Sequence, residues 1–247
     1  MSGQPRTHST AAKDLNTMIE LAVFDMAGTT VDDHGIVYIA LKDAVEETGA
    51  PVSAADLQEW MGADKVSAIT ALMKLGGQEP DGGRVAAAFV RFREILAERY
   101  AATPPVALPG VAEAIETLRG RGIKVALTTG FDDGVAYPLL ESLGWAVGAG
   151  EGTMVDAVVT TSDVAQGRPA PYMIHRAMER TGVHNVRAVL AAGDTVVDMQ
   201  AGRNAGAIAV GVLTGKLGRA ELAAVSHDHI LAGVADVPGL AETQPGA

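Results

Sequence analysis

Three aspartates of this sequence stand directly after short apolar runs, where a carboxylate can take part in chemistry. Asp25 follows the apolar residues 21–24, and Asp194 and Asp198 follow the apolar residues 189–192. In an open parallel sheet, ligands collect beyond the carboxyl ends of the strands, so the three side chains would face one crevice. They would repel one another unless a cation lay between them, and oxygen ligands with room for water favour Mg²⁺. The sequence therefore predicts a magnesium site, although each carboxylate alone could also cap a helix or a turn.

Three further segments offer groups that suit an anion. Thr129 and Gly130 end a predicted strand, and a hydroxyl beside a glycine suits phosphate oxygens. Arg168 opens a proline-rich helix start, which would hold its cation in a rigid loop that faces the crevice. The turn at Gly28 offers backbone N–H groups to the same anion. Taken separately, these features are also typical of ordinary turns and of a surface arginine.

The composition excludes several classes of function. The chain has 247 residues, of which 48% are hydrophobic and 20% charged, so it can bury a large core. A net charge of −11 argues against nucleic acid and anionic membranes as partners, since both reward clustered Lys and Arg. No cysteine is present, which excludes thiolate catalysis and is compatible with the cytoplasm. No apolar run approaches the ~18 residues of a membrane span.

The order of the predicted elements indicates an α/β fold, a Rossmann-like parallel sheet with an all-helical cap domain inserted after the first strand. Residues 18–32 and 103–241 would form the core, 33–102 the cap, and 1–17 and 242–247 flexible tails. Apolar spacing predicts cap helices over 36–49, 53–62, 65–74 and 85–100. In the core it predicts helices over 110–120, 133–143, 169–181 and 196–205, and strands over 21–25, 123–129, 157–161, 188–192 and 208–213.

Taken together, these segments resemble the haloacid dehalogenase superfamily of phosphotransferases and hydrolases. All four of its motifs occur in the right order between Asp25 and Asp198, and the helical insertion follows the first strand as in one of its subclasses. The resemblance implies that Asp25 is the nucleophile that becomes an aspartyl-phosphate. It also implies that Thr129, Gly130 and Arg168 bind the phosphoryl oxygens. The metal ligands would be Asp25, the carbonyl of Ala27 and Asp194, with Asp198 in support.

Ala27 occupies a position where most phosphatases of this superfamily have a second aspartate, the general acid for the leaving group. Losing such an acid costs roughly 10²–10⁴-fold, so the site would favour a leaving group that needs no proton. The form Asp-x-Ala-Gly-Thr, with Arg168 in the third motif, resembles the phosphonoacetaldehyde hydrolases (phosphonatases), which cleave a carbon–phosphorus bond through a Schiff base on a cap lysine. The segment 60–65 resembles the Met-Gly-x-x-Lys part of that cap, which makes Lys65 the candidate amine and Met61 a candidate substrate contact.

The sequence thus favours a Mg²⁺-dependent hydrolase of a small phosphonate, with a homodimer implied only by the resemblance. One alternative is a phosphomonoesterase for a small phosphate ester that takes its acid from His34 or from water. Another is a non-catalytic protein that binds a phosphate ligand. A lysine on a helix is more often exposed to solvent than buried, so whether Lys65 is buried helps to separate these hypotheses.

Overall fold

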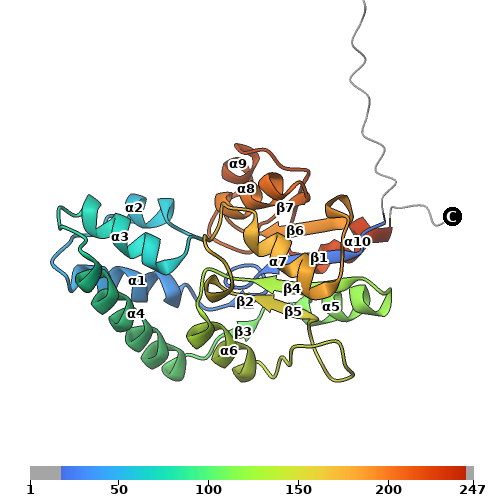
Figure 1. Ribbon diagram of the computed structural model, residues 1–247, viewed down its shortest axis with the longest axis horizontal. Helices are drawn as coiled ribbons and strands as arrows, with labels where there is room; N and C mark the ends of the chain where they lie inside the picture. Colours follow the sequence, from blue (N-terminus) through green and yellow to red (C-terminus); the bar gives the residue numbers. More distant parts are fainter. Residues whose placement is uncertain (1–17, 243–247) are drawn as a thin grey trace, which may run out of the picture.

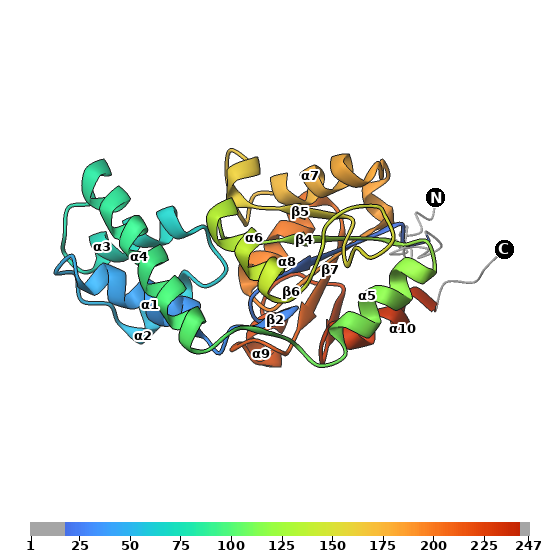
Figure 2. The ribbon, with the colours of Figure 1, turned by 90° about the horizontal axis from the view of Figure 1, so that it is seen from below.

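A computed structural model describes residues 18–242 of the chain (Figure 1). The predicted tails, 1–17 and 242–247, lie outside the described residues, except for Glu242 at the end of the last helix. The described residues form an α/β core and, to one side of it, a group of four helices (Figure 1, Figure 2). We call this group, residues 36–102, the four-helix unit.

The core is built on a six-stranded sheet in which every neighbouring pair is parallel, with the order β5-β4-β1-β6-β7-β8. The strands are β1 (Leu21–Asp25), β4 (Lys124–Thr128), β5 (Ala157–Val159), β6 (Val189–Gly193), β7 (Ile208–Val212) and β8 (His229–Leu231). The predicted parallel sheet is therefore confirmed, with the strand that ends in Asp25 between β4 and β6. The sequence analysis missed β8, a half-buried edge strand of three residues.

Helices cover both faces of the sheet, which explains why the first four residues of β1 are all apolar. Leu21 and Val23 pack toward one face, in a cluster with α7 (Tyr172–Thr181) and α8 (Val196–Ala205). Ala22 and Phe24 pack toward the other face, in a cluster with α5 (Val111–Gly120), α6 (Asp133–Ser142) and α10 (Val237–Glu242). The remaining elements of the core are α9 (Arg219–Ala223) and the short 3₁₀ turns η1 (Thr161–Asp163), η2 (Val186–Ala188) and η3 (Val234–Asp236).

The four-helix unit contains no strand, as predicted. Its helices are α1 (Ile36–Glu46), α2 (Ala54–Glu59), α3 (Lys65–Leu75) and α4 (Gly82–Ala102). Each of the last three begins after a side chain that accepts backbone N–H groups, namely Ser53, Asp64 and Asp81. Within residues 18–242 there is no helix with the length and apolar character needed to cross a bilayer.

The two connections between the core and the four-helix unit pair with each other. β2 (Val31–Asp32) lies antiparallel to β3 (Val106–Ala107), and the N–H of Leu108 donates to the carbonyl of Thr30 over 3.0 Å. These strands of two residues carry no readable alternation, and the sequence analysis did not predict them. Their pairing fixes where the helical insertion leaves and re-enters the core.

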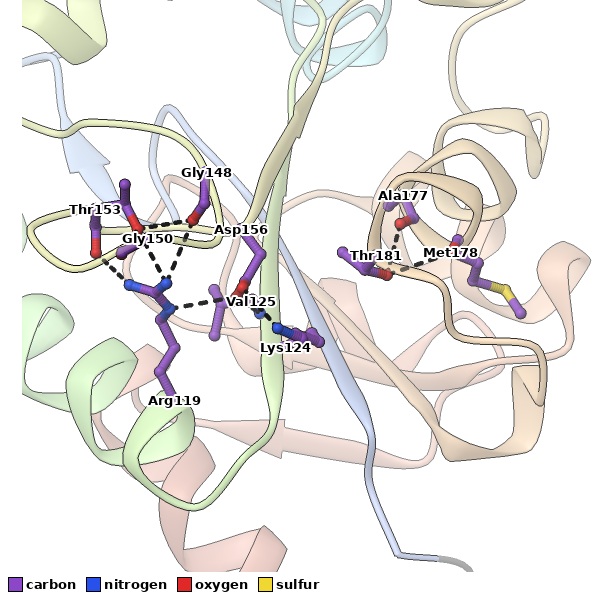
Figure 3. A network of polar contacts seen from close by, with 10 residues as sticks. All are labelled: Arg119, Lys124, Val125, Gly148, Gly150, Thr153, Asp156, Ala177, Met178 and Thr181. Carbon is purple, nitrogen blue, oxygen red and sulfur yellow. Dashed lines mark hydrogen bonds and ion pairs between the residues drawn. The ribbon is translucent and has the colours of Figure 1, made fainter.

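At the end of the sheet opposite to these connections, an ion network forms around the buried side chain of Asp156, close to the start of β4 (Figure 3). The side chain of Asp156 is 6% exposed, with one oxygen 3.3 Å from Arg119 Nε and the other 3.2 Å from Lys124 Nζ. Asp156 also accepts the N–H of Val125 over 2.9 Å. Arg119 in turn donates to the carbonyl and the hydroxyl of Thr153. The network therefore ties the loop before β5 to α5 and β4.

We expect Asp156→Ala to lower the free energy of unfolding by about 3 kcal/mol, because it leaves the partly buried Arg119 cation without its partner. Thermal or urea unfolding measures the loss. Glu179→Ala, which breaks an exposed pair with Arg176, is the matched control and should cost no more than about 0.5 kcal/mol. Equal losses in the two variants would contradict the structural role of Asp156.

Candidate active site

Asp25 is the last residue of β1 and is only 6% exposed. The chain then turns back over Met26, whose carbonyl accepts the N–H groups of Thr29, Thr30 and Val31 over 3.1, 2.8 and 2.9 Å. Gly28 closes this turn with φ of +87°, and a Cβ atom at Gly28 would lie 2.6 Å from a carboxylate oxygen of Asp194. Glycine is therefore required there by both the backbone angle and the space.

Asp194 and Asp198 flank the start of α8, one strand away from Asp25. The hydroxyl of Thr29 donates to Asp194 over 2.9 Å. Asp198 forms a capping box with Thr195, whose N–H it accepts over 3.1 Å. The helix-cap role that the sequence left open is thus real for Asp198. It does not exclude a second role, because the other oxygen of Asp198 accepts from Arg168 and Asp198 lies within reach of the other two carboxylates.

Ligand oxygens of Asp25, Asp194 and Asp198 all lie within 4.8 Å of one another, and the three residues are buried. Burial, together with the charge of Asp198, raises the pKa of Asp25 to about 6 against the lowering effect of Arg168. Burial and the charges of Asp25 and Asp198 likewise raise the pKa of Asp194 well above its ordinary value. A buried, all-oxygen set whose members oppose one another's ionisation fits Mg²⁺, which would remove the repulsion.

Arg168 supplies one cation to this group. It is 7% exposed, and its Nη1 donates to Asp25 over 2.6 Å and also to Asp198. Although burial opposes its charge, these two carboxylates raise the pKa of the guanidinium. The interpretation of Arg168 as a surface residue is therefore wrong. Among the described residues, its buried Nε has no hydrogen-bond partner.

The helix that follows Arg168 begins later than the sequence predicted. α7 starts at Tyr172, with Pro171 as its N-cap, so Pro169 and Pro171 precede the helix and do not form its first turn. The prolines still restrict the loop, because each fixes its own φ angle. The later start of α7 leaves the prediction that a rigid loop holds Arg168 unchanged.

Thr129 and Gly130 lie beside Asp25, because Thr128 pairs with Asp25 at the ends of β4 and β1. Thr129 is 2% exposed, and its hydroxyl accepts the N–H of Phe131 over 3.2 Å. A Cβ atom at Gly130 would lie 2.7 Å from the carbonyl oxygen of Ala63 in the four-helix unit. Gly130 therefore lets the loop of the four-helix unit approach the core backbone closely.

The loop 60–65 makes a second close approach, at Gly62, where a Cβ atom would lie 2.5 Å from the hydroxyl of Thr195. Met61 in this loop is 6% exposed. The four-helix unit thus contacts two of the strand-end loops that surround Asp25. This contact carries Lys65, the first residue of α3, into the same region of the molecule.

Lys65 is 5% exposed, which is unusual for a lysine. Its Nζ donates to the carbonyl of Ala63 over 2.9 Å and lies 5.7 Å from the centre of the Phe131 ring. Burial, followed by the charge of Arg168, lowers the pKa of Lys65 to about 8, although Asp25 and Asp64 act in the opposite direction. The uncharged form of this amine therefore becomes populated at a lower pH than in an exposed lysine.

A cavity of about 250 Å³ adjoins Lys65 where the four-helix unit meets the core, lined among others by Ser67, Phe89, Gly130 and Thr161.

His34, the acid considered for a phosphomonoesterase, is not one of the residues that line this cavity. Its side chain is 39% exposed and its Nδ1 lies 3.4 Å from a carboxylate oxygen of Asp32. His34 is therefore paired with Asp32 of β2.

The sequence analysis missed two residues of the site, Thr29 and Tyr38. Thr29 lies inside the first motif, so its position marked it although no role was assigned. Tyr38 is 9% exposed, and the centre of its ring lies 6.0 Å from Lys65 Nζ. It belongs to the apolar stripe of α1, where an aromatic residue gives no sign of chemistry.

Comparisons with known proteins agree with this geometry. The family model described as haloacid dehalogenase-like hydrolase matches residues 19–206. A phosphonoacetaldehyde hydrolase of Bacillus cereus is 33% identical over 223 residues, which cover 85% of this chain and 80% of that protein. A phosphonoacetaldehyde hydrolase of Bacillus anthracis is 34% identical over 210 residues, with 80% and 76% covered.

Solved structures share the fold. A hydrolase from Pseudomonas syringae superposes with a TM-score of 0.79 at 23% identity, covering 92% of this chain and all of that one. A phosphonoacetaldehyde hydrolase-like protein from Oleispira antarctica superposes with a TM-score of 0.74 at 23% identity, covering 96% of each chain. At this identity the structures support the fold alone.

We expect Mg²⁺ to raise the melting temperature of the wild type but not that of Asp194→Asn. Mg²⁺ at 100 times its Kd stabilises a folded protein by about 2.7 kcal/mol. Without metal at pH 8, the variant should melt at the wild-type temperature or above it, because it lacks a carboxyl group whose ionisation burial opposes. Glu98→Gln, at an exposed position on α4, is the control and should respond like the wild type. An undiminished Mg²⁺ response in Asp194→Asn would contradict the metal site.

Proposed function

The chain belongs to the haloacid dehalogenase-like hydrolase family, and from this premise we propose that it cleaves the carbon–phosphorus bond of a small phosphonate. The proposed substrate is phosphonoacetaldehyde or a close relative with a carbonyl group at the same distance from phosphorus. We also propose that the four-helix unit acts as a cap that closes over the site. The expected Mg²⁺ is part of the same proposal, with Asp25, the Ala27 carbonyl and Asp194 as its ligands.

One observation carries the proposal: Lys65 is buried where the loop 60–65 packs against the strand-end loops that surround Asp25, and this burial lowers its pKa. Phosphate-ester cleavage does not require a neutral amine, whereas an aldehyde or ketone reacts with one to give an imine. Ala27 points the same way, because it offers no acid at the position two residues after Asp25. The relatives at 33–34% identity are phosphonoacetaldehyde hydrolases, which supports the same substrate class.

In the proposed reaction, the carboxylate of Asp25 attacks phosphorus and the carbon–phosphorus bond breaks. The bonding electron pair moves into the substrate carbon skeleton and is taken up by the protonated imine on Lys65, which becomes an enamine. The electron sink thus replaces the proton that a phosphatase would deliver. Protonation of the enamine and hydrolysis of the imine release the aldehyde, and water cleaves the aspartyl-phosphate.

The remaining groups hold the phosphonate. In this proposal Arg168 and the hydroxyl of Thr129 donate to its oxygens, and Gly130 leaves room for close approach. A phosphonate oxygen would also provide the partner that the Nε of Arg168 lacks. Mg²⁺, when bound, supplies positive charge that offsets the repulsion between the phosphonate and the carboxylates.

Borohydride trapping with phosphonoacetaldehyde and Mg²⁺ tests the amine directly. We expect mass spectrometry to find a reduced adduct on Lys65, and phosphate to be released when borohydride is omitted. Lys65→Met should lose both. Lys74→Met removes an exposed lysine of the same helix and should keep both. A Lys65→Met protein that still hydrolyses phosphate esters, together with a wild type that gives no adduct, would favour the phosphomonoesterase hypothesis instead.

The rate of trapping should rise with pH through a midpoint near 8 and level off above it, because the neutral amine is the reactive form. The sign follows from the shift: burial lowers the pKa of Lys65 from 10.5, so the neutral form appears earlier than in an exposed lysine. Mg²⁺ beside Asp25 offsets a charge that raises this pKa, so the midpoint should lie at or below about 8. A midpoint near 10.5 would show that Lys65 is solvated in solution.

A further inference from the structure

We propose that Tyr38 is a further catalytic residue of this site, whose hydroxyl gives a proton to the substrate's carbonyl oxygen as that oxygen leaves in imine formation. The inference rests on the proposed function, since it concerns the amine of Lys65 and a phosphonate with a neighbouring aldehyde. It assigns a role to a side chain that belongs to none of the motifs in the sequence.

The ring of Tyr38 lies next to the proposed imine-forming nitrogen. Its centre is 6.0 Å from Lys65 Nζ and 5.3 Å from Nζ of Lys216, a residue of the loop after β7. Both separations are within the range of cation–π attraction. Tyr38 is 9% exposed, so this contact is shielded from bulk water.

Tyr38 is linked to the carboxylates through the loop after β7, because Lys216 Nζ lies 5.3 Å from its ring and a Cβ atom at the neighbouring Gly215 would collide with a carboxylate oxygen of Asp194. After burial, the charges of Asp194 and Asp25 are the main causes that raise the pKa of Tyr38. Tyr38 is thus near the residue proposed to bind the carbonyl carbon, on the side of the site that holds Asp194. In phosphonoacetaldehyde the carbonyl carbon and phosphorus are separated by one carbon, so the carbonyl group that reaches Lys65 comes close to the Tyr38 ring.

The other charged groups that act on Lys65 are engaged elsewhere or lack a proton to give. Asp64 accepts the N–H of Ser67 at the start of α3. Asp33 accepts two backbone N–H groups of α1 and the hydroxyl of Tyr100. Arg168 is bound to carboxylates and keeps its proton. Tyr38, by contrast, carries a phenol hydroxyl, which can donate a proton.

The step balances as follows. The neutral amine of Lys65 adds to the carbonyl carbon, the π electron pair moves to oxygen, and that oxygen takes a proton from nitrogen to give a carbinolamine. Tyr38 then gives its proton to the carbinolamine hydroxyl, the carbon–oxygen bond breaks, water leaves, and the nitrogen lone pair forms the iminium. The phenolate and the iminium carry adjacent opposite charges. When water later hydrolyses the product iminium, it returns the proton to Tyr38.

The test compares Tyr38→Phe with Tyr100→Phe, since each variant loses one hydroxyl and keeps the ring. Borohydride trapping is measured with phosphonoacetaldehyde and with acetaldehyde, which can form the imine without any attack on phosphorus. We expect Tyr38→Phe to trap either aldehyde about 10²-fold more slowly, within the usual range for loss of a general acid. Tyr100→Phe should stay close to the wild type. Mg²⁺ binding, measured by calorimetry, should be the same in all three proteins.

Wild-type trapping rates in Tyr38→Phe would overturn the role of Tyr38 and leave that of Lys65 standing. Equal slowing in both variants would also overturn it, because the loss would then reflect the packing of α1 and α4. If the wild type itself gives no adduct with either aldehyde, the proposed function fails. A further variant with 3,5-difluorotyrosine at position 38 has a more acidic phenol of similar shape. It should trap at least as fast as the wild type, and a fall to the rate of Tyr38→Phe would count against proton donation.

Discussion

Mutual repulsion among three buried carboxylates is the constraint on which the rest of this site depends. Arg168 pairs with Asp25 and Asp198. Asp194 has no ion pair within the described part of the chain and is held only by Thr29 and its own backbone. A divalent cation among the carboxylates would relieve this repulsion, and no side-chain cation of the described residues does so for Asp194. The proposed phosphonate would add a further negative charge to this site, which positive charge must also balance.

The same electrostatics connects the carboxylates to Lys65. Asp25 favours the ammonium form of Lys65, whereas burial and Arg168 oppose it. Any cation that binds at Asp25 therefore also favours the neutral, reactive amine. In the proposed mechanism, metal binding and the reactivity of the amine would therefore be coupled in sign, even though Lys65 is not among the expected metal ligands. This coupling would keep the amine charged until the phosphoryl side of the site is complete.

Burial of Lys65 is itself a product of two separately packed parts. α3 presents the residue, but the contacts at Gly62 and Gly130 bring its loop against the core. Glycines suit these positions because a Cβ atom at either would push the two backbones apart. Opening of the four-helix unit would return Lys65 to water and its pKa toward the ordinary value. In the proposed mechanism, the amine of Lys65 would therefore react only while the four-helix unit is closed over the core.

The sequence alone determined the order of elements, the parallel core, the helical insertion and the strand-end positions of Asp25, Asp194 and Thr129. It could do so because apolar periodicity and strand-end position are local properties. Local patterns failed for β8, for the pairing of β2 with β3 and for the start of α7, where elements are short or depend on a distant partner.

Tertiary structure alone decided the chemistry of the side chains. Arg168 and Lys65 could equally have been surface residues by sequence, and Tyr38 looked like part of an apolar stripe. Their burial, and the altered pKa values that follow from it, depend on contacts between segments far apart in the chain. Desolvation and charge–charge interaction act through space, so residue spacing can suggest which groups react but cannot fix how strongly each is perturbed.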